Sequence, residues 1–226
     1  MRKIQRLAAV GAMAALTVAL GACGSSETPS TSTPESAPAP TSAPSAAGDG
    51  VTQISDIFGP ACAMVPTEGE GSAQGMVDDP VATAASNNPL VSTLVTAVGA
   101  VPGLADTLNN AEALTVYAPG NDAFAAVQTA LGDEAFNALL ADPAQLGPLL
   151  SYHVVGTRYN AEQLVEMGRT EQLAPAGATV TIGGTADAPT FAGPGNTTPA
   201  TTLCGNIPTS NATVFVIDAV LMPTAS

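Results

Sequence analysis

The segment TVYAPGNDAF, residues 115–124, constrains the fold more than any other part of the sequence. It begins with three β-branched or aromatic side chains that favour a strand, Thr115, Val116 and Tyr117. Pro119 and Gly120 then form a turn pair, and Asn121 is a favoured residue at the N-cap of a helix. The segment therefore predicts a strand, a tight turn and a helix over residues 122–131, with Asn121 as its N-cap. Phe124 is expected to face the core from that helix.

Two later segments extend this pattern. SYHVV, residues 151–155, contains Tyr152 and His153. ATVFVIDAVLMP, residues 212–223, includes a nearly continuous apolar run over residues 213–221, in which Val214 lies and which Asp218 interrupts. Such a run predicts a strand that is covered on both faces.

In this order the three segments resemble the two terminal motifs and the central Tyr-His motif of the fasciclin domain, a module of adhesion and matrix proteins. The resemblance covers about residues 60 to 224, and the segment DPVATAASNNPL, residues 79–90, is similar to actinobacterial fasciclin lipoprotein antigens. The family usually has Thr or Ser where Gly120 stands, and Gly allows whatever φ the turn requires. The resemblance implies structural roles for Thr115, Val116, Tyr117, Pro119, Asn121, Phe124, Tyr152, His153, Val214 and Asp218.

The rest of the chain predicts helices first and strands later. Asp79 and Asn88 are the expected N-caps of helices that begin at Pro80 and Pro89. The second of these carries an apolar stripe formed by Leu90, Leu94 and Val98. Further helices are predicted at residues 134–140, 143–149 and 161–166, and strands at residues 179–182, 190–191, 201–204 and 213–221. This order indicates an α+β fold, one fasciclin-like domain over residues 51–226 whose first-half helices pack on a β-rich second half.

The N-terminus predicts export and lipid anchoring. Basic residues at positions 2, 3 and 6 precede an uncharged apolar stretch, residues 7–22, which is too short for a membrane span and typical of a signal peptide. The stretch ends in Leu-Gly-Ala before Cys23, which resembles a bacterial lipobox. We therefore expect residues 1–22 to be removed and Cys23 to be acylated. The alternative is an ordinary secretory signal with Cys23 as an incidental thiol.

The segment after the expected cleavage site has a composition typical of a tether. Residues 24–50 hold seven Ser, five Pro, five Ala and four Thr without a large apolar side chain, so residues 23–50 are expected to be the lipidated Cys and a disordered tether. After cleavage only Arg158 and Arg169 remain against 19 acidic residues, a net charge of 2 − 19 = −17. A surface with so few basic groups cannot neutralise phosphates, so nucleic acid is excluded as a partner.

Cys62 and Cys204 remain as an even pair in an exported chain, which predicts a disulfide. The fasciclin resemblance implies the same bond, tying an N-terminal extension to the sheet. Two buried free thiols are the alternative. Neither CxxC nor metal-ligand spacing is present, so no metal or cofactor is expected.

Catalytic interpretations are weak. His153 is the sole histidine, and on a strand Ser151 would face the same side, as a nucleophile and its base must. No G-x-S-x-G elbow is present, and a structural His153 is the preferred interpretation. Asp78 and Asp79 are better explained by helix capping than by paired-carboxylate chemistry. Asn196 and Asn211 match the glycosylation sequon.

These observations predict a non-enzymatic lipoprotein on the outer side of a bacterial membrane. Its fasciclin domain is expected to bind an extracellular or cell-wall protein or glycan, which implies adhesion or host interaction. The alternative is a carrier or sensor of a small apolar ligand, which would require an apolar cavity near the helix that begins at Pro89. A hydrolase that uses His153 is the third hypothesis, and it requires that residue to be exposed beside a nucleophile.

Overall fold

The computed structural model describes residues 50–223, which belong to one compact unit. The predicted signal peptide, Cys23 and almost all of the predicted tether lie outside the described residues. The first described residue is Gly50, whose carbonyl oxygen accepts a hydrogen bond of 2.9 Å from the Thr213 hydroxyl. The folded domain therefore includes residue 50.

Helices dominate the first half of the domain, as the sequence predicts. The elements before the first strand are η1 (Ile54–Asp56), η2 (Pro60–Met64), α1 (Ala73–Met76), α2 (Val81–Ser86), η3 (Pro89–Val91), α3 (Ser92–Ala100) and α4 (Leu104–Asn110), where η denotes a 3₁₀-helix. After strand β1 (Leu114–Pro119) come α5 (Asn121–Leu131), α6 (Asp133–Ala141) and α7 (Pro143–Ser151). The short elements α1 and α4 carry no strong sequence signal and were not predicted.

The second half supplies most of the strands. These are β2 (Val154–Val155), β3 (Arg169–Glu171), β4 (Thr179–Thr185), β5 (Ala188–Ala192), β6 (Ala200–Pro208) and β7 (Ala212–Ile217), with helix α8 (Ala161–Met167) between β2 and β3. The strand order is β2-β1-β7-β6-β5-β4-β3. Only the β1–β7 pair is parallel, and the other pairs are antiparallel. Helices and strands thus form the expected α+β fold.

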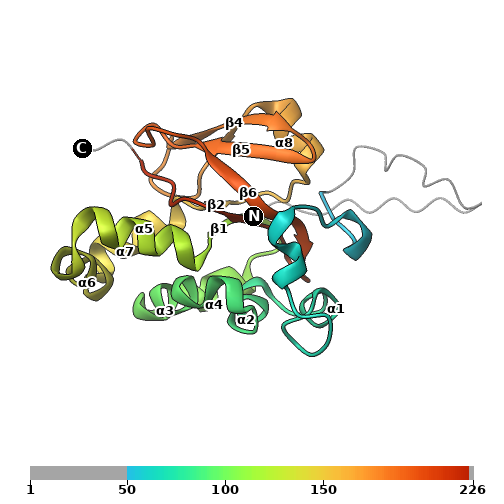
Figure 1. Ribbon diagram of the computed structural model, residues 1–226, viewed down its shortest axis with the longest axis horizontal. Helices are drawn as coiled ribbons and strands as arrows, with labels where there is room; N and C mark the ends of the chain where they lie inside the picture. Colours follow the sequence, from blue (N-terminus) through green and yellow to red (C-terminus); the bar gives the residue numbers. More distant parts are fainter. Residues whose placement is uncertain (1–49, 224–226) are drawn as a thin grey trace, which may run out of the picture. The chain divides into compact units, whose positions relative to one another are not determined.

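Two apolar clusters lie on opposite faces of the central strands. In the first, residues of α2 to α7 pack against β1, β6 and β7, around side chains such as Leu94, Phe124 and Val116. In the second, Tyr117, Phe191 and Phe215 pack together and are covered by Leu164 of α8. Figure 1 shows α2 to α7 below the central strands and α8 beside β4 and β5 above them. The alternation of Val116 and Tyr117 between the two clusters explains why β1 is buried throughout.

Two predicted helix caps are wrong. Helix α2 begins at Val81 rather than Pro80, and the Asp79 side chain does not cap it. The Val81 N–H instead donates to Oδ1 of Asn211, 2.9 Å away and 130 residues later. Helix α5 begins at Asn121 with Gly120 as its N-cap, so Asn121 does not cap its own helix.

The predicted cap at Asn88 is confirmed. Its side chain accepts a hydrogen bond of 3.0 Å from the Leu90 N–H. The first turn after it is the 3₁₀-helix η3, and the α-helical geometry begins only at Ser92. Leu94 is buried and Leu90 and Val98 are partly buried against the first cluster, as the predicted stripe requires.

The last strand is shorter than predicted. β7 ends at Ile217, four residues before the end of the apolar run. The Asp218 carboxylate accepts hydrogen bonds from the N–H and the hydroxyl of Thr201, at 2.7 and 2.6 Å. Asp218 therefore fixes the end of β7 to the beginning of β6.

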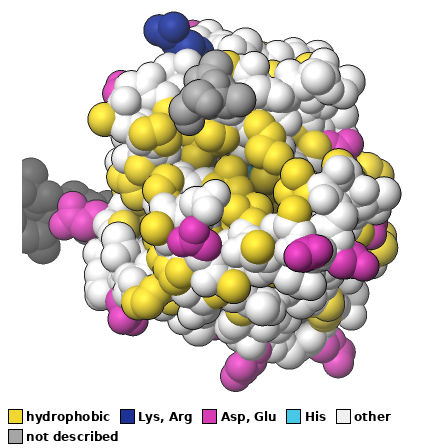
Figure 2. Space-filling view, turned by 90° about the vertical axis from the view of Figure 1, so that its left-hand side faces the viewer, with side chains coloured by type: hydrophobic (Ala, Val, Ile, Leu, Met, Phe, Trp, Pro, Cys, Tyr) yellow, Lys and Arg dark blue, Asp and Glu magenta, His cyan; other side chains and the backbone are white. Residues whose placement is uncertain are grey.

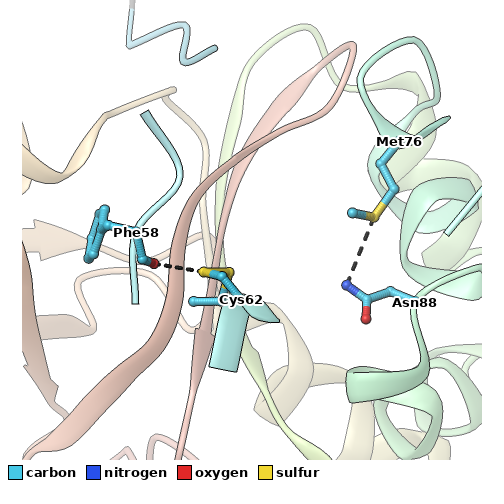
Figure 3. The surroundings of a disulfide bond; sticks show 5 residues. Phe58, Cys62, Met76 and Asn88 are labelled. Carbon is cyan, nitrogen blue, oxygen red and sulfur yellow. Dashed lines mark hydrogen bonds between the residues drawn. A yellow bond between two sulfur atoms is a disulfide. The ribbon is translucent and has the colours of Figure 1, made fainter. Parts of the chain in front are cut away.

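Cys62 of η2 and Cys204 of β6 form the predicted disulfide, with their Cα atoms 5.0 Å apart. It joins the N-terminal extension to the sheet, where Phe58 also forms a bridge with Gly205. Figure 3 shows the Cys62 sulfur facing the Phe58 carbonyl oxygen, 2.9 Å away. Because a disulfide sulfur carries no hydrogen, this is a close contact and not a hydrogen bond. On the right of the same view, the Asn88 amide points to the Met76 sulfur at 3.8 Å.

Candidate functional site

The three segments singled out in the sequence meet in the middle of the domain. In the parallel pair of β1 and β7, Val116 lies opposite Val214 and Tyr117 lies opposite Phe215. The Tyr117 N–H donates to the His153 carbonyl oxygen at 2.8 Å. The three sequence motifs therefore consist of residues that the fold brings together. What they form is a packing unit, because Tyr117, His153 and Phe215 are buried at its centre.

His153 is a structural residue. Its imidazole is buried, with Nδ1 2.8 Å from the Leu149 carbonyl oxygen and Nε2 accepting the Leu221 N–H at 2.9 Å. These partners require the neutral tautomer with the hydrogen on Nδ1. Burial lowers the pKa of His153 to about 4, although the hydrogen bond to Leu149 opposes this change.

The hydrolase hypothesis does not fit this geometry. Both ring nitrogens of His153 are engaged with the backbone, so neither can take a proton from Ser151. Ser151 also ends helix α7 and lies on no strand, so the predicted same-side arrangement with His153 is wrong. Ser151 and His153 do not form a nucleophile and base.

Two tyrosine hydroxyls anchor neighbouring elements. The Tyr117 hydroxyl lies 3.1 Å from the Thr170 hydroxyl, and burial raises the pKa of Tyr117 well above its usual value. The Tyr152 hydroxyl donates to the Thr179 carbonyl oxygen at 2.8 Å, and burial raises its pKa as well. Tyr152 thus joins the end of α7 to the beginning of β4.

The remaining residues of the first segment also have structural roles. The Thr115 hydroxyl donates to the Thr157 carbonyl oxygen at 2.8 Å and accepts the Tyr159 N–H at 2.9 Å. Pro119 is buried at the end of β1, and Phe124 is buried in the first cluster.

Asn121 contacts a different helix from the one that it was predicted to cap. Its Oδ1 accepts the Thr93 N–H at 3.0 Å, and its Nδ2 donates to the Pro89 carbonyl oxygen at 2.8 Å. The side chain therefore joins the beginning of α5 to the beginning of α3.

The two sequon asparagines are held by the backbone. Asn211 is buried, and its Nδ2 donates to the carbonyl oxygens of Leu108 and Ala111 at 2.8 and 2.9 Å. Asn196 accepts the Met222 N–H at 2.7 Å and donates to the Val220 carbonyl oxygen at 2.9 Å. Because their amide nitrogens are engaged in the folded domain, these side chains serve the fold and are poor glycan acceptors.

Arg158 has a structural role that its place in the sequence does not reveal. Its Nη2 donates to the carbonyl oxygens of Thr209 and Ala212, both at 2.8 Å, and its Nε donates to the Thr213 hydroxyl at 3.2 Å. Its guanidinium thereby fixes the turn between β6 and β7. One sequence signal was present, since the chain after the expected cleavage site has only two basic residues.

An apolar groove of about 990 Å³ opens on one face of the domain. It is bounded by α6 and α7, by the loop between β3 and β4, by the loop between β5 and β6, and by the chain that follows β7. Leu139, Pro148, Ala176 and Met222 are among its lining residues, and no lining side chain is charged. Figure 2 shows hydrophobic side chains gathered in a hollow on this side, with acidic side chains around it. The groove unites four segments that are distant in the sequence, so no local sequence pattern reveals it.

A second, smaller cavity lies among the helices. It has a volume of about 240 Å³ and is lined by α2, α3, α4, β1 and the segment around His153. Its position beside α3 is the one that the apolar-carrier hypothesis requires. Valine, leucine and alanine side chains make up most of its wall.

Metal and membrane sites receive no support from the described residues. Residues 50–223 contain no group of three or more His, Cys, Asp or Glu side chains that is placed to hold a metal ion. In the same range no individual helix has the length and apolarity to cross a membrane. The pair Pro89–Ala100 and Leu104–Asn110, bent by 111°, meets these measures only when the two are taken together.

Comparison with known proteins agrees with this fold. The Fasciclin domain family pattern matches residues 89–223, and the chain belongs to the fasciclin family. It is 37% identical over 227 residues to the cell surface glycolipoprotein MPT83 of Mycobacterium tuberculosis, with 96% of each chain covered. It is 40% identical over 192 residues to the immunogenic protein MPB70 of Mycobacterium bovis, covering 81% of this chain and 88% of that protein.

A solved structure shows the same fold. The FAS1 domain pair of the insect cell adhesion molecule fasciclin I superposes with a TM-score of 0.55 at 15% sequence identity. The superposition covers 66% of this chain and 52% of that chain. At this identity the comparison concerns the fold alone.

Proposed function

We propose that this protein is a lipoprotein, anchored through Cys23 on the outer side of a bacterial membrane, whose fasciclin domain binds a protein outside the cell. The names of its relatives, a cell surface glycolipoprotein and an immunogenic protein, support an extracellular location. The signal-like N-terminus and the Ser/Pro-rich segment before residue 50 support anchoring and display. The uncharged groove on an acidic domain is the observation on which the binding function rests.

The chemistry of the groove favours a protein partner with an exposed apolar segment flanked by basic side chains. Leucine, proline, alanine and methionine line the groove, so burying them against apolar side chains supplies the attraction. Residues 50–223 contain no lysine, Arg158 is buried, and Arg169 is the one exposed basic side chain in that range. An acidic surround attracts basic partners and accelerates their association at low ionic strength.

A glycan is the less favoured occupant. Sugar rings are commonly bound against exposed aromatic faces, which supply large rigid contact areas. Tyr152 is the one aromatic residue that lines the groove, and its side chain is fully buried. The groove therefore offers apolar surface without an aromatic platform.

The test is affinity capture with residues 24–226 immobilised, from cell-envelope and host-surface extracts. Ala144→Arg and Ala176→Arg place a bulky cation on exposed groove positions, whereas Ala126→Arg changes an exposed residue of α5 outside the groove. We expect a partner that is retained by the wild type and by Ala126→Arg, and is lost with both groove variants. Its binding should weaken as salt rises. Equal capture by all variants, or capture of glycan alone, would contradict the proposal.

The cavity beside α3 favours carriage of a small apolar ligand as a second candidate function. Its volume of about 240 Å³ exceeds the roughly 150 Å³ at which an engineered apolar cavity binds benzene. Native interiors are otherwise densely packed, so an apolar space of this size in the core can bind an apolar ligand that restores the missing contacts. Thermal stabilisation of the protein by small apolar compounds would test this function directly.

A further inference from the structure

The cavity among the helices has one open end and one closed end. Its floor is formed by buried residues, among them Val116, Leu150 and Val154. At the other end Ser86 and Gly99, which also line it, are exposed to solvent. The cavity therefore leads from the surface between α2 and α3 to the central strands.

Small side chains keep this space open. Ala82 and Ala85 of α2, Gly99 of α3 and Ala105 of α4 line it, where larger side chains would fill it. A Cβ added at Gly99 would meet no atom within 4 Å. The cavity therefore exists because several positions on three neighbouring helices carry small residues, and it does not depend on a single position.

The wall is neutral and aliphatic. No lining side chain is charged, and His153, at the floor, has both ring nitrogens engaged with the backbone. The Tyr117 ring lies on the other face of the sheet, 4.5 Å from the Phe191 ring, so it offers no stacking surface here. A ligand group in this cavity is consequently apolar, and nothing at the floor favours an aromatic ring over an aliphatic chain.

We propose that this cavity binds the end of a single aliphatic chain whose neutral polar head remains at the mouth. The inference rests on the second candidate function, carriage of an apolar ligand, and specifies its ligand class. An apolar cavity of about 150 Å³ holds the six carbons of benzene, so about 240 Å³ holds a chain of roughly eight to ten carbons.

The mouth determines the kind of head. The Ser86 hydroxyl donates to the Thr83 carbonyl oxygen at 2.6 Å, which leaves its own lone pairs free to accept a hydrogen bond from a ligand hydroxyl. Residues 50–223 carry 16 acidic residues against two arginines, so an anionic head is repelled. A fatty alcohol, a monoacylglycerol and a glycolipid share the required chemistry.

Calorimetric titration of the protein, as residues 24–226, with primary alcohols tests whether the cavity binds an aliphatic chain and how long that chain can be. Affinity should rise about fourfold for each added CH₂ from butan-1-ol to octan-1-ol and level off near ten carbons, since each buried CH₂ contributes about the same free energy. Octane-1,8-diol is the matched control, because one of its hydroxyls must enter the apolar floor without a partner. It should bind at least tenfold more weakly than octan-1-ol.

Further probes identify the head. Octanoate should bind more weakly than octan-1-ol, and the gap should narrow as salt rises. Octyl glucoside that binds as tightly as octan-1-ol indicates a glycolipid, whereas binding of octan-1-ol alone indicates a ligand with a small head. Both results agree with a neutral head. Octanoate that binds more tightly than octan-1-ol would overturn the proposal of a neutral head.

Two filling variants locate the site. Gly99→Leu occupies the mouth and Ala85→Leu occupies the wall, and each should weaken octan-1-ol binding at least tenfold. Ala100→Leu, on the exposed neighbouring residue that does not line the cavity, should bind like the wild type. The use of two filling positions keeps the test decisive if one variant fails to fold.

The outcomes separate this inference from the function on which it rests. If benzyl alcohol binds in the cavity and octan-1-ol does not, carriage stands and the aliphatic-chain inference is overturned. If neither binds, both are overturned. The inference is also overturned if both filling variants still bind octan-1-ol like the wild type. The same holds if octane-1,8-diol binds as tightly as octan-1-ol.

Discussion

Nε2 of His153 accepts a hydrogen bond of 2.9 Å from the backbone N–H of Leu221, 68 residues later in the chain. On the other side of the ring, Nδ1 lies 2.8 Å from the carbonyl oxygen of Leu149 in α7. One imidazole thus holds the segment after β7 against the end of a helix. Since that segment and α7 both border the apolar groove, the geometry of the groove depends on this ring.

His153→Ala should lower the free energy of unfolding by about 2 to 4 kcal/mol. The substitution leaves the Leu221 N–H and the Leu149 carbonyl without their partner and opens a cavity in the core. Urea denaturation measures the change. A variant as stable as the wild type would revive a catalytic interpretation of His153.

The pKa of His153 also predicts how stability depends on pH. With the folded pKa lowered to about 4 and an unfolded value of 6.5, the unfolded state binds the proton between these pH values while the folded state does not. The free energy of unfolding should therefore decrease by on the order of 3 kcal/mol as pH falls from about 6.5 towards 4. His153→Gln retains an acceptor for the Leu221 N–H but does not titrate, so this part of the pH dependence should disappear.

Reduction of the Cys62–Cys204 disulfide should lower the melting temperature. The bond joins residues 142 positions apart, and loss of such a crosslink typically costs about 2 to 4 kcal/mol. For a domain of this size 2 kcal/mol corresponds to roughly 4 to 8 °C. The Cys62→Ser/Cys204→Ser variant should melt at the lower temperature whether or not a reductant is present. Two thiols that react with a labelling reagent in the oxidised native protein would disprove the bond.

Asn121→Ala should cost about 1 to 2 kcal/mol, because it removes the acceptor for the Thr93 N–H and the donor to the Pro89 carbonyl. Hydrogen exchange distinguishes this role from capping of α5. The Thr93 amide should exchange faster in the variant, while the amides in the first turn of α5 should keep their wild-type rates. Asp122→Ala, at the exposed neighbouring position, should leave Thr93 unchanged.

Cys23→Ala should release the protein from the membrane or leave its precursor uncleaved, with the domain still folded. Cell fractionation and incorporation of labelled palmitate measure the two effects. A wild-type protein that stays in the membrane without incorporating label would contradict lipidation.

Local sequence signals predicted most of the element types. The strand at Thr115 and the helix after Asn88 are both present in the structure. Propensity and capping preferences depend on near neighbours, so such features are visible in a single sequence.

The partners of polar side chains were not predictable in the same way. Asn121 has the chemistry of an N-cap, but which helix it contacts depends on how α3 and α5 pack. Asn211 matches a glycosylation sequon because Ala212 and Thr213 follow it, whereas only the tertiary fold brings its Oδ1 to the Val81 N–H. The groove and the cavity are likewise made of segments from several elements, and no local pattern describes them.

The position of β7 in the sheet has a consequence for the order of folding. β7 is the last strand of residues 50–223, yet it lies between β1 and β6, with Leu114 opposite Ala212 in the parallel pair. Chain entropy must be lost over nearly a hundred residues before this pairing returns any free energy. A chain that emerges with its N-terminus first therefore holds one edge of β1 without its parallel partner until almost all of the domain is free. The sheet of residues 50–223 can therefore be completed only when its last strand is available, so removing β7 would leave β1 and β6 unpaired with each other.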